Sequence, residues 1–149
     1  MIGFARGKHL ATVVLSLAVL GTVFGCRGYQ GPPPIRFWTD DLAFQVSTTP
    51  IQPPAREDIV FKVVVRDKNS GQAIEGGEGR VFATSPDGIN AWDGLTPGQQ
   101  PGTYTAKLHF LTAGDWALGM QFRRAQSQPV ERLDWKQTIW PGNDEGGTK

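Results

Sequence analysis

Apolar and polar residues alternate with a period of two through most of the chain after residue 38, and this pattern restricts the fold more than any other feature. The clearest run covers residues 59–65, where four large apolar side chains occupy every second position. Successive side chains of a strand point to opposite faces, so each such run predicts a strand with one buried face. The runs that carry the pattern are residues 42–47, 59–65, 81–85, 103–111, 115–123 and 133–139.

These strands, separated by turn residues, predict an all-β fold. Nineteen glycines and eleven prolines are scattered between the runs, as is typical of short antiparallel strands joined by tight turns. We expect an antiparallel immunoglobulin-type (Ig-like) β-sandwich of about seven strands over residues 38–140, with a hairpin at Ala113-Gly114-Asp115. The predicted core residues are Phe44, Phe61, Val63, Val65, Tyr104, Leu108, Phe110, Trp116, Leu118 and Phe122.

The N-terminus has the parts of a secretory signal peptide. Arg6 and Lys8 precede eleven uncharged residues at 10–20, and small residues follow. This apolar stretch is shorter than the roughly 20 residues that a membrane-spanning helix needs. We therefore expect residues 1–25 to be a signal-peptide helix that is removed on export, with an uncleaved anchor helix as the alternative.

Cys26 is the chain's single cysteine, so it has no partner for an intrachain disulfide. The residues Val23-Phe24-Gly25-Cys26 resemble the bacterial lipobox. This resemblance implies cleavage before Cys26 and attachment of lipid, including palmitate, to its thiol, which would anchor the protein to a membrane. Arg27 at the next position favours the outer membrane if the cell has two membranes; the alternative for Cys26 is a free thiol in a loop.

Proline-rich and glycine-rich segments flank the predicted domain. Residues 26–37 contain Pro32-Pro33-Pro34 and show no apolar periodicity, which predicts a flexible, partly extended tether. Residues 141–149 are polar and rich in glycine, and we expect them to form a disordered tail.

Two motifs resemble a known family. Pro101-Gly102-Thr103-Tyr104, followed by Phe110 to Leu118, is similar to the C-terminal half of YtkA-like (FixH-like) extracytoplasmic domains. Val63 to Asp67, followed by Ser70 to Ile74, is similar to an upstream segment of the same family. The resemblance implies an Ig-like sandwich tethered at a membrane, and we expect the Tyr104 hydroxyl to cap a loop as in a tyrosine corner.

Some members of the architecture that this chain resembles handle copper through methionine and histidine side chains on strand edges and loops. After removal of residues 1–25 the chain keeps one of each, His109 and Met120. Alternation places these two side chains on opposite faces, whereas a soft-metal site needs several converging ligands. No metal site and no cofactor are predicted.

Known catalytic arrangements are not recognisable in this sequence. The one histidine beyond residue 25, His109, is expected on an exposed strand face, where it is not placed to form a Ser-His-Asp set. Asp40-Asp41 would point in opposite directions along a strand and are expected to mark the start of an edge strand. Asp87, Asn90 and Asp93 lack the spacing of a calcium loop and fit turn chemistry. We therefore expect a protein that is not an enzyme.

Charge excludes one further class of function. Removing residues 1–25 takes away two of the fifteen basic residues and none of the fourteen acidic ones. The remaining thirteen basic and fourteen acidic residues give a formal charge of −1. Such a domain has no electrostatic footprint for nucleic acid, and the sequence shows no polybasic run for a membrane.

The five tryptophans carry the functional hypothesis. Trp116 and Trp135 lie on apolar strand faces and are expected in the core. Trp38, Trp92 and Trp140 lie near loops or strand ends, where they would either bind a partner or cap the sandwich. We expect a non-enzymatic binding or assembly module of the cell envelope that faces the periplasm or the cell exterior. The alternative is a periplasmic domain that handles a small ligand or copper.

A Cys26→Ala substitution tests the anchor. We expect the variant to lose labelling by radioactive palmitate and to leave the membrane fraction, because the lipid acceptor is gone. Fractionation of cells that express either form measures this. If the variant takes up palmitate to the same extent as the unaltered chain, the lipoprotein prediction is wrong.

Overall fold

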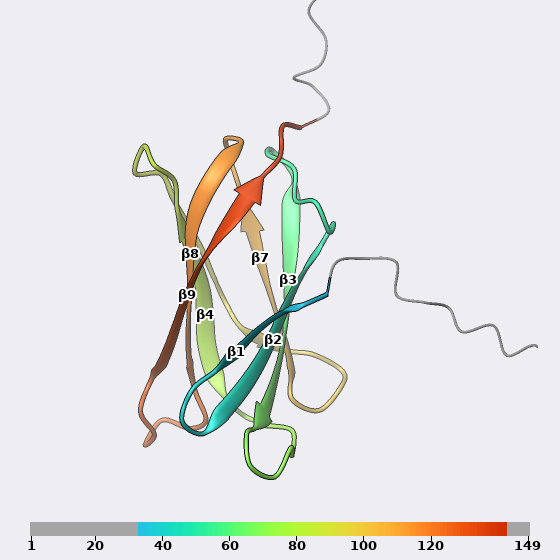
Figure 1. Ribbon diagram of the computed structural model, residues 1–149, viewed down its shortest axis with the longest axis vertical. Coiled ribbons are helices and arrows are strands. Elements are labelled where there is room, and N and C mark those ends of the chain that lie inside the picture. Colours follow the sequence, from blue (N-terminus) through green and yellow to red (C-terminus); the bar gives the residue numbers. More distant parts are fainter. Residues whose placement is uncertain (1–32, 143–149) are drawn as a thin grey trace, which may run out of the picture. The chain divides into compact units, whose positions relative to one another are not determined.

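The computed structural model describes residues 33–142, which form a two-layer β-sandwich (Figure 1). In that range no helix has the length and apolar character needed to span a bilayer. The predicted signal peptide, Cys26, most of the tether and residues 143–149 of the tail lie outside the described residues.

The described strands form two antiparallel sheets. The five-stranded sheet has the order β1 (Ile35–Trp38), β2 (Leu42–Thr49), β3 (Asp58–Asp67), β7 (Thr103–His109), β6 (Thr96–Pro97). The four-stranded sheet has the order β5 (Asn90–Gly94), β4 (Glu78–Thr84), β8 (Gly114–Arg123), β9 (Glu131–Ile139). The predicted β-sandwich is confirmed. The described strands number nine instead of about seven, because β1, β5 and β6 were not predicted.

The core lies between the sheets and contains all of the predicted core residues, none of which is more than 2% exposed. Aromatic rings join the two layers edge to face. Tyr104 on β7 meets Phe122 on β8 at a centroid distance of 5.3 Å, and Phe110 meets Trp116 at 5.0 Å. Such pairs add to the free energy gained from burying their area. Trp135 is only half-buried and packs against Phe37 from β1, at 5.5 Å.

The hairpin expected at Ala113-Gly114-Asp115 is wrong. β7 pairs with β3 and β6, whereas β8 pairs with β4 and β9, so the connection crosses from one sheet to the other. Phe110 and Trp116, at the two ends of this connection, are both buried, and the Trp116 indole donates a hydrogen bond to the Thr112 carbonyl at 3.0 Å. Burial of both rings favours the crossing over a hairpin.

Two expected boundaries also differ from the structure. The sheet begins at Ile35, three residues before the start expected at Trp38, because Phe37 pairs with Phe44 and turns inward against Trp135. Asp40 and Asp41 lie in the turn between β1 and β2, and β2 is an internal strand. These acids therefore do not mark the start of an edge strand.

Tyr104 forms the predicted loop cap. Its hydroxyl donates a hydrogen bond to the Ile74 carbonyl at 2.7 Å and accepts one from the Gly77 amide at 3.0 Å. Burial raises the pKa of this phenol. Gly102, two residues earlier, has a φ of 70°, and a Cβ there would lie 2.7 Å from the Val65 carbonyl oxygen. The motif around Tyr104 thus fastens the segment before β4 to the five-stranded sheet.

A polar cluster joins the layers at one end of the sandwich. Arg124, in the β8–β9 connection, binds the Asp67 carboxylate at 2.8 Å and the Asp41 carbonyl at 3.0 Å. The Ser70 amide, then Arg124, hold the pKa of Asp67 well below its usual range. The carboxylate therefore stays charged and bonded at neutral pH.

A Tyr104→Phe substitution tests the cap. It leaves the Gly77 amide and the Ile74 carbonyl without their partner, so we expect the free energy of unfolding to fall by about 1–3 kcal/mol. Urea denaturation measures the loss. Thr84→Val, which removes an exposed hydroxyl bonded to Asn90 at 2.7 Å, should cost less than about 0.5 kcal/mol. Equal losses in both variants would contradict the role given to Tyr104.

Candidate partner-binding surface

The structure leaves the three candidate tryptophans exposed but does not bring them together. Trp92 is 69% exposed on β5, at the edge of the four-stranded sheet. Trp38 is 61% exposed on β1, at the edge of the other sheet. Trp140 follows β9, where its backbone bonds to Pro53 and Ala55. One shared site made of all three residues is therefore not possible in this fold.

Trp92 is positioned by the hairpin of β4 and β5. The turn between these strands is closed by the Ser85 amide, which donates to the Ile89 carbonyl at 2.8 Å, and by the Ser85 hydroxyl, which accepts from the Ile89 amide. The register that follows places Trp92 directly opposite Phe82 of β4. Directly opposed residues of antiparallel strands share one face, so the two aromatic side chains stand side by side on the outer surface.

The Phe82 ring packs closely against the next strand because that strand has a glycine beneath it. Gly119 of β8 is opposite Phe82, and a Cβ there would lie 2.4 Å from the ring. The guanidinium carbons of Arg80 and Arg132 lie 5.8 and 5.3 Å from the ring centroid, within cation–π distance. The ring is thus fixed between a glycine and two cationic side chains.

We call this surface the aromatic face; it consists of the outward side chains of Trp92, Phe82, Arg80, Arg132 and Gln121. Its charges are held in place by neighbours. Arg132 binds Asp134 through Nε and Nη2 at 3.0–3.2 Å. This contact lowers the pKa of the Asp134 carboxyl and raises that of Arg132. Arg80 donates a hydrogen bond to Gln121 at 3.0 Å.

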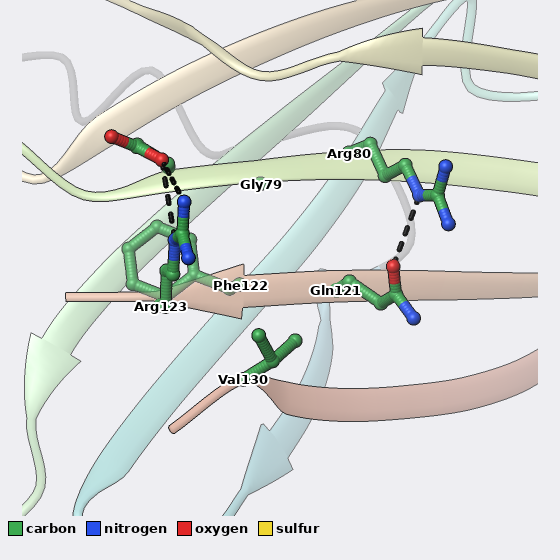
Figure 2. Close-up of a pocket in the computed structure, with 7 residues that line it drawn as sticks. Gly79, Arg80, Gln121, Phe122, Arg123 and Val130 are labelled. Carbon is green, nitrogen blue, oxygen red and sulfur yellow. Dashed lines mark hydrogen bonds and ion pairs between the residues drawn. The ribbon is translucent and has the colours of Figure 1, made fainter. Parts of the chain in front are cut away.

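A shallow groove of about 280 Å³ continues the aromatic face beyond Arg80. Figure 2 shows Arg80 and Gln121 joined across β4 and β8, with Val130 next to β8. Glu78 and Arg123, which also line the groove, form an ion pair at 2.7 Å. Val130 is 55% exposed. The groove offers an apolar side chain among charged ones but no deep cavity.

Sequence reasoning identified Trp92 and missed Phe82, Arg80 and Arg132. The alternation of residues 81–85 already turns Phe82 outward when Val81 and Ala83 are buried. A second signal was Gly119, a small residue inside an otherwise apolar strand, which often marks a close approach by another group. Joining the two signals needs the β4–β8 register, which the sequence does not contain.

His109 and Met120 lie on different sheets. Met120 is fully buried in the core. His109 is exposed, and its Nδ1 lies 3.0 Å from Asp58 Oδ1, which lowers the pKa of that carboxyl. Lys107 Nζ approaches the other oxygen of Asp58 at 3.5 Å. Among the described residues, no group of three or more His, Cys, Asp or Glu side chains could hold a metal ion.

Known structures share this fold at low sequence identity. No family model matches the chain, and no curated protein matches it. A DUF4426 family protein from Pseudomonas aeruginosa is similar, with a TM-score of 0.57 and 12% identity over 73% of this chain and 99% of that one. FetP of uropathogenic Escherichia coli, isolated after expression in the periplasm, has a TM-score of 0.54 and 9% identity over 78% and 100%. A copper-bound FetP variant has a TM-score of 0.52 and 9% identity over 73% and 96%. These likenesses establish the fold, which is compatible with an extracytoplasmic Ig-like domain.

A double-mutant cycle tests the packing of Phe82 on Gly119. We expect Gly119→Ala to cost about 1–2 kcal/mol in the unaltered chain, since the new methyl displaces the ring. In a Phe82→Ala background the same change should be neutral or slightly stabilising, because alanine costs less backbone entropy than glycine. Urea denaturation of the four proteins gives the coupling energy.

Gly94→Ala is the matched control, since a Cβ at Gly94 of β5 has no neighbour within 4 Å. It should not destabilise the chain in either background. A coupling energy near zero between positions 82 and 119 would refute the described packing.

Proposed function

We propose that this protein is an exported, lipid-anchored module of the cell envelope that binds a protein partner through the aromatic face and performs no catalysis. The lipid is carried by Cys26, and the tether joins this lipid to the sandwich. A YtkA-like (FixH-like) ancestry fits the motifs around Tyr104, and Arg27 after the lipidated cysteine favours the outer membrane in a cell that has two.

The exposure of Trp92 carries this proposal. A tryptophan side chain that is 69% exposed leaves a large apolar area in water, and it lies beside Phe82 and two guanidinium groups. Tryptophan and arginine are the residues most enriched among those that dominate binding energies at protein interfaces. The guanidinium groups of Arg80 and Arg132 also supply hydrogen-bond donors at the rim of the aromatic face.

The shape of the surface favours a protein over a small molecule. Small-ligand sites are concave and enclose most of their ligand, whereas Trp92 and Phe82 stand on the outer face of a β-sheet beside a shallow groove. The partner is therefore expected to be a protein of the envelope with a complementary, partly apolar patch.

Copper handling is the second candidate, favoured by the likeness to copper-bound FetP. The residues that would serve here are His109 and Asp58, whose side chains meet at 3.0 Å. The ammonium group of Lys107 lies 3.5 Å from the same carboxylate and would repel a cation. This candidate therefore has weaker support from the side chains than the binding surface has.

Photocrosslinking in living cells tests the binding surface. A photoreactive phenylalanine analogue in place of Trp92 in the full-length chain should give a discrete crosslinked species, to be identified by mass spectrometry. We further expect Trp92→Ala to weaken binding of that species about thirtyfold, the effect of losing a side chain that contributes about 2 kcal/mol.

The analogue at Ile51 is the control, because this residue is 45% exposed in the β2–β3 connection, outside the aromatic face. It should give no such species. The same species at both positions, or none at position 92, would refute partner binding through the aromatic face.

A further inference from the structure

Basic side chains gather on the outer surface of the five-stranded sheet. β3 directs Lys62 and Arg66 to the outer surface, whereas the residues that alternate with them along the strand are buried. Lys107 on β7 and Arg36 on β1 lie on the two sides of β3 in the same outer surface. All four basic residues are exposed. The strand register therefore brings together basic residues that are far apart in the sequence.

Acidic residues do not balance this surface. Among the outward positions of the described strands of this sheet, Asp58 is the one acid, and it is engaged by His109 and Lys107. Within the described residues, neither Arg36, Lys62 nor Arg66 forms an ion pair. The four-stranded sheet differs, because Glu78 and Asp134 pair with its arginines there. Positive charge is thus concentrated on one side of a domain that is nearly neutral as a whole.

Trp38 stands at the edge of this same surface. It shares a cross-strand row with Ala43 and Arg66, and its side chain is 61% exposed. Tryptophan is enriched at membrane interfaces, where its ring reaches the headgroup level. An exposed tryptophan next to basic residues is the combination expected of a surface that rests on a bilayer. We call the set Arg36, Trp38, Lys62, Arg66 and Lys107 the basic face.

The tether leads directly into the basic face. Nine residues, from Cys26 to Pro34, precede β1, which carries Arg36 and Trp38. Even fully extended they reach about 30 Å. A lipid on Cys26 would therefore keep β1 within about 30 Å of the headgroups and make contact with them an intramolecular event.

We propose that the basic face docks on the anionic phospholipid surface of the membrane that holds the anchor. This inference rests on the lipid anchor of the proposed function. Phosphate groups of the lipids attract Arg36, Lys62, Arg66 and Lys107, and Trp38 enters the interface beside them. Because the outer faces of the two sheets point in opposite directions, docking turns the aromatic face away from the membrane, towards a partner.

The full-length lipoprotein, purified from membranes and reconstituted in vesicles, allows a direct test. Lipid on Cys26 blocks the chain's single cysteine, so an introduced one takes an environment-sensitive fluorophore alone. Gln45→Cys places the label on the exposed centre of the basic face, and Ala117→Cys places it on the exposed face of β8 in the other sheet. Vesicles of phosphatidylcholine, with or without phosphatidylglycerol, are the probes.

We expect the label at position 45 to report contact with headgroups only in vesicles that contain phosphatidylglycerol, and the label at 117 to report none. High salt should reverse the contact, because it screens exposed charges. Each basic residue near an anionic surface is worth about fivefold in binding. Arg36→Gln with Lys62→Gln should thus lower the ratio of docked to undocked protein about 25-fold, whereas Arg80→Gln with Lys136→Gln, on the other sheet, should leave it unchanged.

Failure of the anchor and failure of docking give different results. A chain without lipid takes up two labels, one of them on Cys26, which would refute the anchor; the label at position 45 is then read with the same vesicles added to the protein. Contact in vesicles of phosphatidylcholine alone, equal contact at position 117, or no response to loss of Arg36 and Lys62 would each overturn docking by the basic face.

Discussion

The burial of two apolar sheet faces against each other is the constraint on which the rest of this structure depends. Tyr104 against Phe122 and Phe110 against Trp116 hold the layers together edge to face. Once these faces are buried, the period of two forces every intervening side chain to the outside. The outer surfaces therefore carry the side chains of the two candidate surfaces, the aromatic face on one sheet and the basic face on the other.

Alternation alone was enough to predict the sandwich and its core, since a buried face imposes its pattern on every long strand. Short strands escaped: β6 has two residues, and β5 alternates polar residues with Trp92 without a clear apolar face. The β7–β8 connection was predicted wrongly for another reason. A glycine in a turn permits a hairpin and a crossing equally, and the burial of both Phe110 and Trp116 decides between them only after the sheets have packed.

The candidate surfaces depend on register, which local sequence does not contain. Trp92 could be identified because a tryptophan near a turn is conspicuous by itself. Phe82 matters because Gly119 lies beneath its ring, and these residues are far apart in the chain. The basic face is a stronger case, because Arg36, Lys62 and Lys107 come from three strands. A net charge near zero conceals a cluster of this kind, so the absence of a basic run in the sequence said little about the folded surface.

The two outer faces differ in a way that gives a tethered sandwich a direction. Basic residues that lack ion pairs retain their full attraction for a charged surface, whereas arginines paired with Asp134 or Glu78 are partly neutralised and act through their planar groups at short range. The first arrangement suits a diffuse layer of phosphates and the second suits a specific contact. Since the two outer faces point in opposite directions, attraction of the basic face to the membrane would turn the aromatic face away from it. The proposed docking and the proposed partner binding would then reinforce each other, because a docked domain has already lost rotational freedom that association with a partner would otherwise cost.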